Sequence, residues 1–186
     1  NWDLLVAGRA CAGTAGLACN ATFGSSLTLS KASSGDNGLV FLARITAAGV
    51  WQWARQLNSE QPMQVLDVAL QGASVYVAVH HQGSVEVDGL DDPIAGQDRE
   101  AVLIVEFDQS GTTVRSLSVQ TTQIIDEVAS LCVNRQGEMH LALTFGERLI
   151  AGEHVLVSAG GTDAAVLRLG EGEAFAWATS TNSSGD

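Results

Sequence analysis

The residues best suited to bind a metal ion lie in one acidic loop. Asp88 precedes the segment GLDDPIAGQDRE, which contains Asp91, Asp92 and Asp98. Ca²⁺ takes about six to eight oxygen ligands, which loop carboxylates and backbone carbonyls can supply. The spacing D-x-[DN]-x-[DN]-G of an EF-hand is absent. The loop therefore indicates either a Ca²⁺ site or a solvated acidic surface, and no other cofactor is expected.

Tryptophan and histidine are the next candidates for ligand contact. Trp51 and Trp53 lie two residues apart in the predicted strand WQW. Trp53 is expected to pack between units, and Trp51 is expected to lie on the opposite face of the strand. An exposed Trp51 ring could stack on a sugar. None of the four histidines has a Cys, Asp or His partner at a diagnostic spacing: His80, His81, His140 and His154. His80 and His81 are adjacent, so in a strand they cannot ligate one ion.

No catalytic signature stands out. The patterns G-x-S-x-G, P-loop, H-E-x-x-H and paired acids are absent. The run DQSGTT at Asp108 is close to the Asp-box of sialidases, but its glycine comes one residue late. We therefore predict a protein that is not an enzyme. A glycan-binding or glycan-active protein stays open, because glycosidase acids can come from segments far apart in sequence.

The cysteines predict one disulfide. Cys11 and Cys19 bracket the small-residue loop CAGTAGLAC, and a bridge there would staple an insertion between two strands. Such a bond requires an oxidising compartment, which favours a secreted or cell-surface protein. Cys132 lies in the apolar run VASLCVN and is expected to be a small buried hydrophobic residue.

These residues are positioned by a repeat. Ile45, Phe107 and Leu169 stand 62 residues apart, and eight residues after each comes Trp53, Arg115 and Trp177. The period divides the chain into three units: 1–62, 63–124 and 125–186. Short β-branched strands, glycine turns such as those at Gly49 and Gly111, and the lack of helical periodicity predict an all-β fold. The equivalence of Trp53 and Trp177 predicts that they pack between units, and Asp163 is expected to stabilise a turn.

The repeated segments resemble a known family. The stretches VFLARITAAGVWQW, VLIVEFDQSG and GGTDAAVLRL each follow, in part, the pattern of a strand, D-x-S-G and a tryptophan strand. This pattern resembles the SBBP-type bacterial β-propeller repeat. The resemblance covers all three units and implies antiparallel propeller blades in a secreted or surface module. Arg115 replaces the tryptophan in the second unit, and Gly170 replaces the turn aspartate in the third.

Three blades are too few for an ordinary propeller ring, which has about four to eight. Uncovered blades would expose apolar faces and unpaired strand edges. We therefore expect further repeats in the same protein, a homo-oligomer, or an open curved stack. The N-terminus lacks the features of a signal peptide and is expected to begin in mid-strand.

Charge and hydropathy limit the partners. The formal charge of −12 disfavours nucleic acid. No apolar run approaches the roughly 20 residues of a spanning helix. The leading prediction is a non-enzymatic scaffold or adhesion module that binds a surface glycan or protein. The alternatives are a subunit of a ring or filament, and a glycan-binding or glycan-active propeller.

Overall fold

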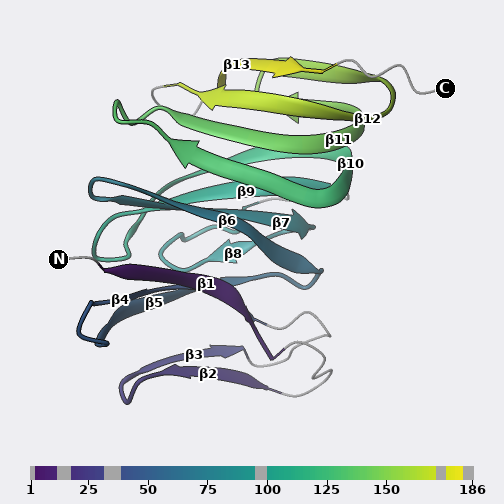
Figure 1. Cartoon of the computed structure of the whole chain (residues 1–186). Helices are drawn as coiled ribbons and strands as arrows, with labels where there is room; N and C mark the ends of the chain where they lie inside the picture. The colour runs from purple at the N-terminus through teal and green to yellow at the C-terminus, as the bar shows by residue number, and fades with distance from the viewer. Residues whose placement is uncertain (1–2, 12–17, 32–38, 95–99, 171–174, 182–186) are drawn as a thin grey trace.

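The computed structural model shows an antiparallel all-β protein, as the sequence predicts. The structure describes residues 3–11, 18–31, 39–94, 100–170 and 175–181, with only the backbone described for 123–129. These residues form thirteen strands in three sheets and contain no helix. Figure 1 shows the strands layered along the molecule, with β13 at one end and the β2–β3 hairpin at the other.

The first sheet has the order β1-β4-β5-β8. Its strands are β1 (Leu4–Ala10), β4 (Leu39–Ile45), β5 (Trp51–Asn58) and the short β8 (Glu86–Val87). A separate hairpin, formed by β2 (Cys19–Phe23) and β3 (Leu27–Lys31), lies between β1 and β4 in the chain. Because β8 pairs with the edge of β5 from a distant part of the sequence, it ties the second predicted unit to the first.

The second sheet has seven strands in the order β13-β12-β11-β10-β9-β7-β6. Its strands are β6 (Met63–Gln71), β7 (Ser74–Gln82), β9 (Glu100–Phe107), β10 (Thr113–Val133), β11 (Met139–Ala151), β12 (His154–Leu169) and β13 (Phe175–Ser180). The long strand β10 pairs first with β9 and then, across two register shifts, with β11. The described strands therefore form no closed sheet, and the expected boundary at 124/125 falls within β10. The division into units remains a prediction.

Three hairpins of the fold have the same register. We call β4–β5, β9–β10 and β12–β13 the first, second and third repeat hairpins. The equivalent cross-strand pairs stand 62 residues apart: Arg44↔Trp53, Glu106↔Arg115 and Arg168↔Trp177. The next pair toward the turn follows a register shift in every hairpin: Ile45↔Trp51, Phe107↔Thr113 and Leu169↔Phe175. The cross-strand pairing and its register shift therefore recur with the same 62-residue period as the sequence.

Alternating side chains of these strands build three apolar clusters. One cluster joins the first sheet to β7 and the second repeat hairpin, and includes Val40, Leu42, Trp53, Val77, Leu103 and Phe107. Another joins the second repeat hairpin to β11 and the third repeat hairpin, and includes Ile104, Leu117, Leu141, Leu143, Leu167 and Leu169. The last lies between the first repeat hairpin and β2–β3, and includes Cys19, Phe23, Leu29, Leu39, Ala43 and Ala54. The β2–β3 hairpin therefore covers the face of the first repeat hairpin that points away from the second.

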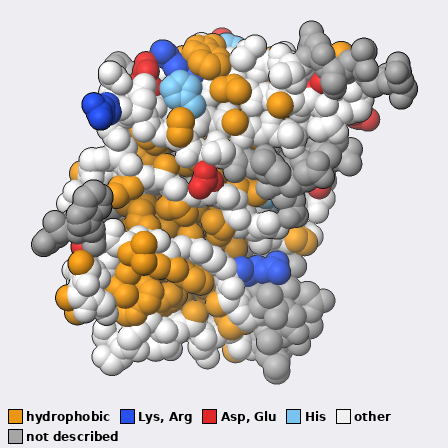
Figure 2. Space-filling model, viewed as in Figure 1, with side chains coloured by type: hydrophobic (Ala, Val, Ile, Leu, Met, Phe, Trp, Pro, Cys, Tyr) orange, Lys and Arg blue, Asp and Glu red, His pale blue; other side chains and the backbone are white. Residues whose placement is uncertain are grey.

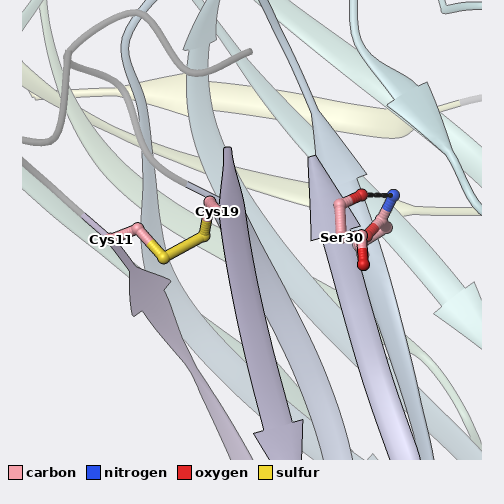
Figure 3. The surroundings of a disulfide bond; sticks show 4 residues. Cys11, Cys19 and Ser30 are labelled. Carbon is pink, nitrogen blue, oxygen red and sulfur yellow. Dashed lines mark hydrogen bonds between the residues drawn. A yellow bond between two sulfur atoms is a disulfide. The ribbon is translucent and has the colours of Figure 1, made fainter. Parts of the chain in front are cut away.

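Two expectations about single residues meet different outcomes. The disulfide between Cys11 and Cys19 is confirmed, and it joins the end of β1 to the start of β2 (Figure 3). The expectation that Cys132 is buried is wrong, because this thiol is free and exposed. In β10 the neighbouring Leu131 takes the buried side of the strand, so alternation places Cys132 on the other side.

Candidate functional site

The most elaborate polar arrangement lies where the first repeat hairpin meets the turn of the second. Trp53 is 5% exposed and donates its indole Nε1–H to the carbonyl of Gln109 at 2.8 Å. Arg44 donates Nη1–H to the same carbonyl at 2.8 Å, and Arg55 donates Nε–H to the carbonyl of Gly111 at 2.6 Å. Three donors from β4 and β5 therefore bind the carbonyls of one turn. We call this arrangement the Trp53 latch.

Close packing at Gly111 completes the latch. A Cβ atom on this glycine would lie 2.7 Å from Trp53 Cδ2, and its φ is +78°. Glycine is therefore required twice, by the left-handed backbone and by the ring above it. The turn is also held by Asp108, whose Oδ1 accepts from the backbone N–H of Ser110 and of Thr112. The hydrogen bond from the Ser110 hydroxyl, followed by these amide bonds, lowers the pKa of the Asp108 carboxyl.

The third repeat hairpin carries two of the three latch donors, and no turn among the described residues lies upon them. Trp177 and Arg168 occupy the positions of Trp53 and Arg44. Trp177 is 37% exposed, although its ring centroid lies 6.0 Å from that of His140. Arg168 pairs with Glu138 through Nη1 at 2.9 Å, while its Nε atom is buried without a hydrogen-bond partner. The structure thus places Trp53 and Trp177 in equivalent registers but in different environments.

The second repeat hairpin uses the same positions for an ion pair. Arg115 donates Nε–H to Oε2 of Glu106 at 2.7 Å, and Tyr76 donates its hydroxyl to Oε1 at 3.2 Å. Burial raises the pKa of the Tyr76 hydroxyl. Glu106 is itself buried, and these two partners supply hydrogen bonds to both of its carboxylate oxygens. Arg115 therefore replaces the repeat tryptophan as one member of a buried polar group.

The acidic loop connects strands of the first two units. The backbone N–H of Gln56 donates to Oδ2 of Asp88 at 3.1 Å, and the Asp88 N–H donates to the Gln56 carbonyl at 3.2 Å. Asp88 and Asp91 line a pocket of ≈ 330 Å³ together with Gln56, Asn58 and Glu86. Gln56 Oε1 and Asn58 Oδ1 are buried there without hydrogen-bond partners.

The described geometry of this pocket does not support the predicted Ca²⁺ site. Asp92 is exposed and does not line it, and Asp98 lies outside the described residues. Within the described ranges, no group of three or more His, Cys, Asp or Glu side chains is placed to hold a metal ion. The Ca²⁺ site therefore stays a prediction, and the contact that the structure assigns to Asp88 is a strand-to-strand bridge.

Trp51 lies on the face that the β2–β3 hairpin covers. Its ring centroid is 5.1 Å from that of Phe23, in an edge-to-face arrangement. A Cβ atom on Gly24 would approach Trp51 Cδ1 to 3.1 Å, so the hairpin turn also packs on this ring. The glycan hypothesis expected an exposed Trp51, but the side chain is only partly accessible.

Buried polar groups elsewhere contact the backbone. His81 is fully buried, and its Nδ1 donates to the Gly83 carbonyl at 3.0 Å. Burial lowers the pKa of this imidazole. Asp163, expected to stabilise a turn, is buried and accepts the Ala159 N–H at 2.9 Å. Its carboxylate therefore holds the backbone around Gly160 and Gly161.

Sequence reasoning did not identify Arg44, Arg55 or Asp67 as structural residues. Asp67 accepts the Leu131 N–H through Oδ2 at 2.7 Å, which links β6 to the distal part of β10. A signal existed for one of them, since Arg44 and Arg168 stand two repeat periods apart. Arg55 has Leu117 and Thr179 at the equivalent positions, so the repeat gives no signal for it.

A scan against models of known protein families finds no match to this chain, and a search of curated proteins finds no match either. Among the described residues, no helix has the length and hydropathy needed to cross a membrane. The fold and its polar contacts define an antiparallel all-β protein with three equivalent hairpins.

Proposed function

We propose that this chain is a non-enzymatic structural module of a secreted or cell-surface protein. Its repeat hairpins would correspond to blades of a β-propeller-like stack, as the resemblance to the SBBP-type repeat implies. Rigid, layered hairpins would hold the connecting loops as a binding surface for a protein or a surface glycan. The module would thus act as a scaffold rather than as a catalyst.

One observation carries this proposal: the repeated residues themselves form the contact between units. Trp53 of the first predicted unit packs on Gly111 and donates to a turn carbonyl of the second, and each of these two residues has a counterpart of the same type one or two periods away, Trp177 and Gly49. Asp88, the first residue of the acidic loop, bridges to Gln56 across the same boundary. A role in holding units together explains why these residue types recur at this spacing.

The comparison of two equivalent tryptophans tests the scaffold role. Trp53→Ala removes a buried ring and its hydrogen bond, so we expect it to lower the free energy of unfolding by about 3–5 kcal/mol. Trp177→Ala removes a partly exposed ring at the same register, and we expect a loss of about 1 kcal/mol or less. Urea unfolding of dilute protein measures both. Equal losses for the two variants would contradict the proposal.

The compartment can be tested through the disulfide. In protein isolated from its native source without reductant, an alkylating reagent should modify Cys132 and leave Cys11 and Cys19 protected, as mass spectrometry of peptides would show. Alkylation of all three thiols would place the chain in a reducing compartment and overturn this part of the proposal.

The assembly alternative is favoured by one specific feature. Trp177 is the exposed equivalent of a residue that docks a turn elsewhere in the same fold. Trp51, on which the glycan alternative depends, shares its surface with Phe23 instead. Assembly through this hairpin is therefore the second candidate function.

A further inference from the structure

One end of the molecule carries latch donors to which the described part of the chain brings no turn. Inside the chain, Trp53 and Arg44 bind the turn of the second repeat hairpin. The equivalent Trp177 is 37% exposed, and the equivalent Arg168 pairs with Glu138 through Nη1 at 2.9 Å while its side chain stays 35% exposed. The third repeat hairpin therefore presents an incomplete copy of the Trp53 latch.

The first repeat hairpin presents the complementary turn. Thr46 and Val50 close this turn through a backbone hydrogen bond of 2.9 Å, and Gly49 has a φ of +79°. Gly111, at the equivalent position of the second hairpin, has a φ of +78° and lies under Trp53. Among the residues that the structure describes, a Cβ atom on Gly49 would meet nothing within 4 Å, so these residues leave room for a tryptophan ring above the turn.

The surroundings of this turn are apolar and accessible. Figure 2 shows hydrophobic side chains gathered over the region of β1, β4 and β5. Leu4 and Val50, in β1 and beside the turn, are 62% and 55% exposed. Contact with a second protein surface would remove them from water. Both halves of the latch are therefore present on one chain, at different repeat hairpins, and both are open.

We propose that a second copy of this chain completes the latch. Trp177 of one copy would lie over Gly49 of the next, and the side chain of Arg168 would donate to the Ala47 carbonyl, which corresponds to that of Gln109. This inference rests on the proposed scaffold function, because it extends the internal contact between units to a contact between molecules. The contact is heterologous, so it produces a chain or a closed ring of copies.

The β2–β3 hairpin limits the size of this contact. It covers the sheet face beside the turn, where Phe23 and Leu29 pack against the first repeat hairpin. A docking copy therefore meets the turn and its apolar margin rather than the whole sheet face. We expect reversible association that increases with protein concentration, in contrast to the permanent contact within the chain.

Two variants with defects at opposite ends test the proposal. Trp177→Ala removes the donor side. Gly49→Asn blocks the acceptor side, because asparagine tolerates a left-handed backbone and its side chain would fill the empty space above the turn. Val157→Ala, at another exposed apolar position, and Gly72→Asn, at another open turn with positive φ, are the matched controls.

Sedimentation velocity and light scattering over a concentration series give the readout. We expect the wild-type chain and both controls to form species heavier than the 19.4 kDa monomer, while each end variant alone stays monomeric. Mixing the two end variants should restore a species of twice the monomer mass and no larger one, because each pair has one intact donor and one intact acceptor. Recovery in the mixture also shows that both variants are folded.

Three results would overturn the proposal. They are a wild-type chain that stays monomeric at every concentration, a Trp177→Ala variant that associates like wild type, and a mixture that does not form the pair. The last two would point to a different surface or to a two-fold contact. None of these results depends on the unfolding comparison of Trp53 with Trp177, so failure of the scaffold proposal would be recognised separately.

Discussion

Two glycine turns with the same backbone offer a direct measure of the latch. Gly111 and Gly49 occupy equivalent positions and have φ values of +78° and +79°. Alanine at either site meets the same left-handed backbone penalty, which is about 1 kcal/mol. The two sites differ in what the new Cβ atom meets. At Gly111 it would lie 2.7 Å from Trp53 Cδ2, whereas at Gly49 no described residue lies within 4 Å of it.

The difference between the two variants isolates the packing of Trp53. Overpacking of a tight site costs about 1–3 kcal/mol in addition to the backbone term. We therefore expect Gly111→Ala to destabilise the fold by about 2–4 kcal/mol and Gly49→Ala by about 1 kcal/mol. The ring is held in place by the Gln109 carbonyl and cannot move aside without losing that bond.

Urea unfolding, followed by far-ultraviolet circular dichroism, measures both free energies under the same conditions. Dilute protein removes any contribution from association at Gly49. Equal destabilisation by the two variants would refute the reasoning, because it would mean that Trp53 yields without cost and the latch does not hold the units together.

Three further predictions follow from buried groups. Burial lowers the pKa of His81 in the folded chain, whereas in the unfolded chain this histidine has the ordinary pKa of about 6.5. Below that pH the unfolded chain binds more protons than the folded chain, so the free energy of unfolding should fall as the pH drops through about 6.5. His81→Leu should reduce this pH dependence in urea titrations from about pH 8 to about pH 5. Reduction of the Cys11–Cys19 disulfide should lower the free energy of unfolding by about 2–3 kcal/mol, measured with and without reductant, and an unchanged midpoint would contradict the stapling role. Arg115→Ala should destabilise the fold by about 3–5 kcal/mol because it leaves the Glu106 carboxylate buried, and Arg115→Ala with Glu106→Gln should recover part of this loss.

The repeat made much of the fold predictable from sequence. Hairpins with a glycine turn and a period of 62 residues indicated an all-β protein, and the register of all three hairpins has that period. The disulfide was predictable because its cysteines are only 8 residues apart around a loop of small residues. These features are local, and local patterns determine turns and strands directly.

Contacts between distant segments were not predictable in the same way. The pairing of β5 with β8 and the continuous strand β10 depend on which edges meet in space. Cys132 was assigned to the buried side of its strand because the surrounding run is apolar, whereas the alternation of β10 buries Leu131. Exposure of Trp51 was left open, because nothing in the sequence shows that the β2–β3 hairpin folds over it.

In the candidate site, too, the local features were predictable from the sequence and the contacts between distant segments were not. The equivalence of Trp53 and Trp177 could be read from spacing, but their different exposure could not, because it depends on whether a following turn is present in space. Asp88 was selected for its charge, yet its described contact is with the backbone of Gln56. An acidic residue type alone does not distinguish a metal ligand from a bridge between strands.

The most direct test of the account is a double-mutant cycle between Trp53 and Gly111. Trp53→Leu shortens the side chain that faces the turn, so alanine at position 111 should cost less in that background than in wild type. We predict that the double variant loses less unfolding free energy than the sum of the two single losses, by about 1 kcal/mol or more. Additive losses within about 0.3 kcal/mol would show that the two residues do not interact, and would contradict the latch between repeat units.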